Sequence, residues 1–151
     1  MKIGALSLLM LISINLFACN GNHKELVEPD IPNSGSMNLR IIVGQSEFTA
    51  TLYDNATATA FKTKLPMTIH MVELNGNEKY YDLPDNLPTN ASNPGTIQSG
   101  DLMLYGSNTL VLFYKTFSTS YNYTRIGKIT DPEGLAEALG SGKVDVTFEL
   151  K

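Results

Sequence analysis

The sequence contains one cysteine, Cys19, among 151 residues, so no disulfide can form within the chain. Basic residues are also few: 11 Lys and Arg stand against 15 Asp and Glu, a formal net charge of −4 at pH 7. No stretch clusters Lys or Arg with interleaved aromatic residues, the pattern that binds a phosphate backbone. These absences exclude a disulfide-stapled fold and argue against nucleic acid as a partner.

Motifs for several common chemistries are missing as well. We find no glycine-rich phosphate loop, nucleophile elbow or dinucleotide fingerprint. His23 and His70 have no second His, Cys or carboxylate at the spacing of metal ligands. We therefore expect neither a metal site nor another cofactor.

An apolar run opens the chain, and its form is typical of an export signal. Met1 and Lys2 are followed by IGALSLLMLISINLFA, which ends at Ala18 and is too short to cross a bilayer comfortably. Cys19 comes next, and LFAC resembles a bacterial lipobox, in which the cysteine carries a lipid and the peptide is cut just before it. A conventional secretory signal is the alternative, but the place of Cys19 at the end of the run favours the lipobox. We expect residues 1–18 to be a lipoprotein signal peptide and Cys19 to be the lipid attachment site.

Residues 19–37 are polar and dense in Asn, Pro, Gly and Ser. They can bury too little apolar surface to offset their ordering entropy, so we expect a flexible tether. Because the chain has no polybasic patch, membrane contact should come from acyl chains on Cys19. Asn20 is not the aspartate that retains lipoproteins at the inner membrane of enteric bacteria, which favours the outer membrane. The expected location is a bacterial cell envelope, with the domain facing the periplasm or the surface.

Strand patterns dominate the rest of the chain, residues 38–151, which has the length of one small domain. Alternating or apolar runs between turn formers predict strands at 39–43, 47–53, 66–74, 78–83, 102–105, 109–115, 123–129 and 144–150. Residues 82–95 contain three prolines and are expected to form an irregular surface loop.

Two short helices are expected between these strands. The first follows Asp54 or Asn55 and is stopped by Pro66, and the second contains Leu135 and ends at Gly140. Because the first and last strands both alternate well, we expect them to pair and close the sheet, which removes exposed edges. We predict a mainly β fold, a closed antiparallel eight-stranded barrel with two short capping helices. A two-sheet sandwich is the alternative, since strand count alone does not separate the two.

Four stretches in this order carry a family resemblance: LYDNATATAFKTKLP, IQSGD, LVLFY and RIGKITDPEGLAEAL. LYDNATATAFKTKLP resembles the strand and first helix of the cyclophilins, and IQSGD resembles their Gln-Gly-Gly-Asp turn. LVLFY resembles the strand that carries a pocket phenylalanine, and RIGKITDPEGLAEAL resembles the strand that runs into the second helix. The match is to small bacterial cyclophilin-like proteins over roughly residues 38–150. It implies a cyclophilin-like barrel with an outer groove in which family members isomerise prolyl peptide bonds.

The same resemblance implies a set of groove residues. With Gln98 on the family's glutamine, Phe113 falls on a pocket phenylalanine and Tyr123 on a groove position, which makes all three ligand-binding candidates. Isomerisation has a barrier of roughly 20 kcal/mol and needs a cation beside the prolyl nitrogen. The position of the family's catalytic arginine falls at about Asn90, so that arginine is absent. Arg125, two residues after Tyr123, is a candidate replacement.

Three of the candidates also have a structural interpretation: Gln98 as a turn residue, Phe113 as ordinary core and Arg125 as a solvated strand residue.

The function we favour is a lipid-anchored, monomeric cyclophilin-like domain that binds a proline-containing peptide or small molecule, with weak or no isomerase activity. One alternative is an active peptidyl-prolyl cis-trans isomerase whose cation is Arg125 or a loop lysine. The other is a structural envelope protein without a ligand.

Overall fold

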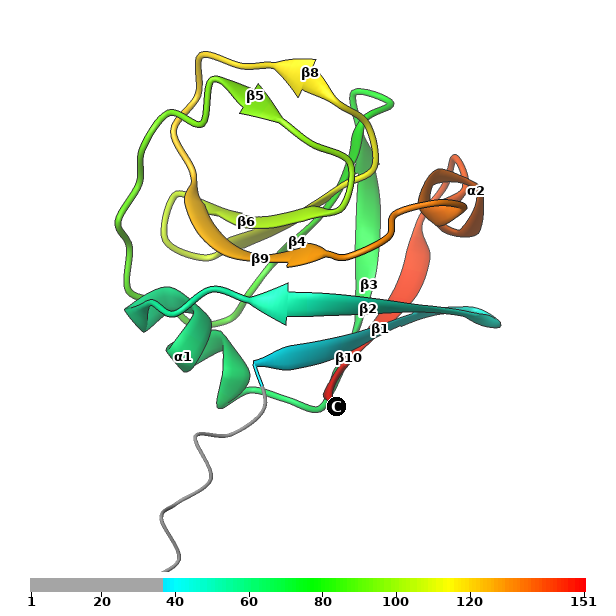
Figure 1. The fold of residues 1–151 in the computed structure, drawn as a ribbon, viewed down its shortest axis with the longest axis horizontal. Coiled ribbons are helices and arrows are strands. Elements are labelled where there is room, and N and C mark those ends of the chain that lie inside the picture. The colour runs from blue at the N-terminus through cyan, green and yellow to red at the C-terminus, as the bar shows by residue number, and fades with distance from the viewer. Residues whose placement is uncertain (1–36) are drawn as a thin grey trace, which may run out of the picture. The chain divides into compact units, whose positions relative to one another are not determined.

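A computed structural model describes residues 37–151, which Figure 1 draws as a coloured ribbon. The predicted signal peptide, Cys19 and all but the last residue of the predicted tether lie outside the described residues. Neither helix within residues 37–151 is long and apolar enough to cross a membrane.

Eight strands of the described chain form a closed antiparallel barrel in the order β1-β10-β3-β4-β7-β6-β9-β2. Their bounds are β1 (Asn38–Val43), β2 (Ser46–Leu52), β3 (Met67–Leu74), β4 (Glu78–Asp82), β6 (Asp101–Tyr105), β7 (Thr109–Phe113), β9 (Thr124–Ile129) and β10 (Val144–Leu150). The predicted mainly β fold with an eight-stranded closed barrel is confirmed, and closure rules out the sandwich.

The barrel closes where the first and last strands meet. β1 pairs with β10 from Leu39 opposite Leu150 to Val43 opposite Val146, and it pairs with β2 on its other side. β2 in turn pairs with β9 at a tight approach: a Cβ added to Gly127 would lie 2.7 Å from the carbonyl oxygen of Thr51. Only glycine fits that position without a shift of the backbone.

The interior of the barrel is apolar because inward positions on the strands alternate with outward ones. Leu39 and Ile41 of β1 and Phe148 of β10 are fully buried there. The Phe148 ring meets the ring of Phe61 edge to face, with centroids 5.8 Å apart. Burial of each such side chain contributes about 1.5–3 kcal/mol.

Two helices, α1 (Ala56–Lys62) and α2 (Leu135–Leu139), lie at opposite ends of β1 and β2 in Figure 1. Asn55 caps α1, and its Oδ1 accepts a hydrogen bond of 2.8 Å from the backbone N–H of Ala58. The helix ends at Lys62, with Thr63 as its C-cap, before Pro66. Each helix contributes buried apolar residues to the barrel core, so both helices are held by packing.

A two-stranded sheet outside the barrel was not predicted. β5 (Thr96–Ile97) pairs with β8 (Phe117–Ser118), and both appear at the top of Figure 1. Strands of two residues are too short to produce a recognisable alternation. This sheet covers a second apolar cluster, separate from the barrel core, which we call the outer cluster: Ile97, Met103, Val111, Phe113 and Tyr123, with Tyr80 and Phe117 packed against it.

Candidate functional site

A pocket of about 480 Å³ lies on the outer side of the barrel, beside the outer cluster. Strands β4, β6 and β7 contribute lining residues, as do the segment Phe117–Tyr121 and Tyr123. Leu74, Asn75 and Asn77, at the β3–β4 turn, complete the lining of the pocket. Its volume is in the range of pockets that hold small organic ligands.

Strand geometry sends three residues of β4 into this pocket. Glu78, Tyr80 and Asp82 line it, while Lys79 and Tyr81, between them, face the barrel interior. On the neighbouring strand β7, the residue opposite Tyr80 is Val111 and the residue opposite Asp82 is Thr109, and both also line the pocket. The site is therefore built on rigid strands of the barrel wall.

Five aromatic rings form a continuous series along the pocket. The Tyr121 ring meets Tyr105 at a centroid distance of 6.1 Å, and Tyr105 meets Tyr123 at 5.6 Å. Phe113 continues the series, 5.5 Å from Tyr123 and 5.8 Å from Phe117. Edge and tilted contacts of this kind add stability beyond area burial.

The charged groups that line the pocket are both acidic. Glu78 and Asp82 are carboxylates, and no Lys, Arg or His occurs among the lining residues of the described chain. Burial, and then the charge of Glu73 on β3, raise the pKa of Glu78 to about 7. Burial, and then the charge of Glu78, raise the pKa of Tyr123 to about 12. The pocket thus favours positive over negative charge.

Two of the residues that the sequence singled out meet at this pocket. Phe113 is fully buried and lies beneath the pocket as part of the outer cluster, and its ring contacts Tyr123. Tyr123 is 7% exposed and lines the pocket itself. Phe113 is therefore both a core residue and a support for the pocket wall.

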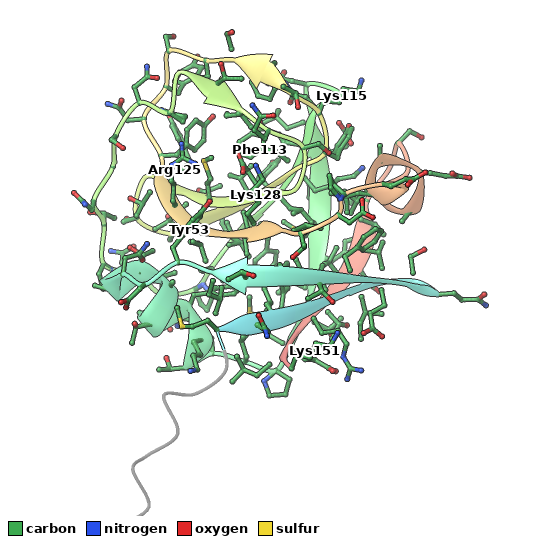
Figure 2. The ribbon with its side chains drawn as sticks, in the orientation of Figure 1. Tyr53, Phe113, Lys115, Arg125, Lys128 and Lys151 are labelled. Carbon is green, nitrogen blue, oxygen red and sulfur yellow. The ribbon has the colours of Figure 1, made fainter. Side chains whose placement is uncertain are left out.

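The other two candidates lie elsewhere. The Gln98 side chain is exposed, with its Oε1 3.5 Å from the Thr116 hydroxyl, and its backbone N–H donates to the buried Asp101 carboxylate. Arg125 is exposed on β9 and does not line the pocket; Figure 2 shows it in the same half of the view as Phe113, β5 and β8. Asn90, at the expected arginine position, is exposed and donates its backbone N–H to the Thr124 hydroxyl.

Sequence reasoning missed most of the pocket lining, including Glu78, Tyr80, Asp82, Tyr105 and Tyr121. One signal was present: β6 and β7 are apolar at nearly every position, DLMLY and TLVLF, and are buried on both faces. Strands with two buried faces need a second layer outside the barrel, and the outer cluster with its covering segment supplies that layer.

A family model described as the cyclophilin-like family matches residues 41–149. The chain belongs to the cyclophilin-like family. The solution structure of the hypothetical protein AF2241 from Archaeoglobus fulgidus has the same fold, with a TM-score of 0.54 and 18% identity, over 80% of this chain and 100% of that chain. No curated protein matches the chain in sequence.

The pKa of Glu78 gives the cyclophilin-like domain a testable pH dependence. Its folded pKa of about 7 lies above the ordinary value of 4.5, so the fold favours the protonated acid and loses stability as pH rises between these values. The titratable groups whose charge is coupled to that of Glu78 are Glu73 on β3, Tyr114 after β7 and Tyr123. Glu78→Gln should therefore raise the free energy of unfolding by about 1–2 kcal/mol at about pH 8.5 and hardly at all at about pH 4.5.

Urea denaturation at the two pH values measures this difference. Glu137→Gln, at an exposed position on α2, removes the same charge away from the pocket and is the control. Equal effects of Glu78→Gln at both pH values would contradict a raised pKa.

Proposed function

We propose that the chain is a lipid-anchored cyclophilin-like protein of a bacterial cell envelope that binds a peptide or small ligand in its aromatic pocket, with weak or no prolyl isomerase activity. The observation that carries this proposal is the composition of the pocket: aromatic rings and two carboxylates, without a basic side chain among the lining residues of the described chain.

Ligand binding is supported by the form of the site. Ligand pockets combine a largely apolar lining with a few polar groups that orient the ligand. Here Tyr80, Tyr123 and Val111 supply apolar surface, and Glu78 and Asp82 supply the polar groups. All but Tyr123 lie on strands of the barrel wall, which favours a preformed site.

Weak or absent isomerase activity is supported by the charges. A twisting prolyl amide gains basicity at its nitrogen, and a nearby cation stabilises that state. The pocket offers carboxylates instead, which accept hydrogen bonds and cannot donate them when ionised. The Arg125 hypothesis stays a prediction; the exposed position of that residue outside the pocket lining gives it no support.

Lipid anchoring rests on the LFAC motif and on the absence of a polybasic patch, as argued above. Mass spectrometry of the full chain extracted from membranes should find an acylated Cys19 as the first residue. A mature chain that begins elsewhere without acyl groups would contradict the anchor.

Two measurements on the purified full chain test the pocket. Exchange NMR on an Ala-Ala-Pro-Phe peptide should detect no faster cis-trans exchange than in buffer. Native mass spectrometry should find a ligand carried through purification. Ser118→Trp, at an exposed lining position, should remove that ligand, and Ser141→Trp, exposed and outside the pocket, should retain it. Rapid exchange would favour the isomerase, and an empty protein would favour the structural alternative.

A further inference from the structure

Glu78 is the most unusual polar group of the pocket. It is 8% exposed, yet within residues 37–151 no hydrogen bond or ion pair reaches its carboxylate. The neighbouring charge that acts on the Glu78 carboxyl is another carboxylate, that of Glu73, which already accepts hydrogen bonds from Lys79 and from the Tyr114 hydroxyl. Buried carboxylates in proteins are normally paired. Because Glu78 lines the pocket, a partner can reach it from there.

Asn77, the neighbouring residue, adds a second unsatisfied acceptor. Its side-chain Oδ1 is buried and has no hydrogen-bond partner among the described residues, and Asn77 lines the same pocket. A carboxylate and a neighbouring amide oxygen, both without donors, make this part of the pocket rich in hydrogen-bond acceptors, which suits a ligand that donates hydrogen bonds.

The rest of the lining suits a cation with an apolar stem. Tyr80, Tyr105, Tyr121 and Tyr123 present aromatic rings, whose faces attract ammonium and guanidinium groups. Asp82 adds a second carboxylate on the same face of β4. An anionic ligand would be repelled by both carboxylates, and a neutral apolar ligand would leave Glu78 buried without a partner.

We propose that the pocket binds a positively charged organic group, an ammonium or guanidinium on an apolar stem, with the Glu78 carboxylate as its counter-ion. This inference rests on the proposed ligand-binding function and names the chemistry of the ligand. The same group occurs on small amines and on Lys or Arg side chains of peptides, and the two sources are separated by experiment.

Titration calorimetry on the full chain tests the inference with matched probes. n-Butylammonium and n-butylguanidinium are compared with 1-butanol, which has nearly the same stem and no charge. The peptide arm compares acetyl-Ala-Lys-Ala-amide with its norleucine analogue. Both small cations should bind, and the alcohol should bind at least about tenfold more weakly. Tighter binding of the lysine peptide than of butylammonium would identify a peptide as the source, and the reverse a small amine.

Glu78→Gln should weaken binding of the cations at least about tenfold and leave the affinity for 1-butanol unchanged. The variant keeps the shape of the side chain and removes a destabilising buried charge, so unfolding of the variant would not explain a loss of cation binding. Glu137→Gln, exposed on α2, should bind like the wild type.

Two results overturn the inference, and they differ in what they say of the proposed function. Equal affinity for butylammonium and butanol, unchanged in Glu78→Gln, would leave a ligand-binding pocket without cation selectivity. Absence of binding by every probe would also overturn the inference. In that case a ligand found by native mass spectrometry would still support the proposed function, and an empty protein would reject both.

Discussion

Replacement of Lys79 by methionine should lower the free energy of unfolding by about 3–5 kcal/mol. Lys79 lies on β4 with its side chain inside the barrel and is fully buried. Its Nζ donates hydrogen bonds to the Glu73 carboxylate, to the Gly140 carbonyl at 2.7 Å and to the Gly142 carbonyl at 2.6 Å. Three donors thus meet three acceptors, and the ammonium joins β3 and β4 to the segment after α2.

Methionine fills a similar volume but donates no hydrogen bond. Both glycine carbonyls would lose their partner. The Glu73 carboxylate would lose its cation and keep two hydrogen bonds, from the Tyr114 hydroxyl at 2.7 Å and from the Gly76 backbone N–H at 2.9 Å. The effect is large because three acceptors lose their donor at once, and one of them is the carboxylate of Glu73, whose side chain is only 23% exposed.

Lys115→Met is the matched control, because the Lys115 Nζ lies 6.0 Å from the Tyr114 ring centroid, much as Lys79 does at 5.8 Å, but Lys115 is exposed. Urea denaturation should show a change within about 0.5 kcal/mol for Lys115→Met. A comparably small change for Lys79→Met would mean that the buried ammonium contributes nothing to stability.

The pH dependence of Lys79→Met offers a second check. In the wild type, burial acts to raise the pKa of Glu73, but the hydrogen bonds from Lys79 and Tyr114 outweigh it and lower the pKa. This stability is present above the unfolded pKa and is lost as pH falls through the folded value. Without Lys79 the pKa of Glu73 should rise. Protonation of Glu73 at about pH 4 should then reduce the difference in free energy of unfolding between the variant and the wild type. Glu73→Gln in the same chain should recover part of the loss at neutral pH.

Lys79 also shows where sequence reasoning reached its limit. The barrel followed from alternation in strands such as VDVTFEL, where Val146 and Phe148 are indeed fully buried. Alternation cannot identify a lysine that faces the interior, because two of its three partners, the Gly140 and Gly142 carbonyls, are 61 and 63 residues away in the sequence. In EKYYD the charged residues occur on both faces of the strand, so the pattern gave no direction to Glu78.

The candidate site was predicted in part, and the reason is geometric. Phe113 and Tyr123 were singled out through the family resemblance, and they are in contact. Arg125 was associated with Tyr123 because residues two apart in a strand share a face. Tyr123 lies just before β9 and forms an isolated bridge with Ser92. Tyr123 is buried whereas Arg125 is exposed, so a shared face does not give the two side chains the same surroundings. Turn and loop contacts of this kind are set by tertiary packing, which spacing does not encode.

Phe113→Ala should have the other large effect, a loss of about 3–5 kcal/mol in the free energy of unfolding together with loss of the pocket ligand. Phe113 is fully buried in the outer cluster, where its ring touches both Phe117 and Tyr123. Its removal opens a cavity beneath two residues that line the pocket, and the series of rings is interrupted between Tyr123 and Phe117.

Leu112→Ala separates the two consequences, because Leu112 is the adjacent residue of β7 but faces the barrel core. It is fully buried as well, so its truncation should cost a comparable amount, about 2–5 kcal/mol, by urea denaturation. The bound ligand detected by native mass spectrometry should persist in Leu112→Ala and be absent in Phe113→Ala. If both variants retained the ligand equally, the aromatic support beneath Tyr123 would have no part in binding, and Phe113 would act as core alone.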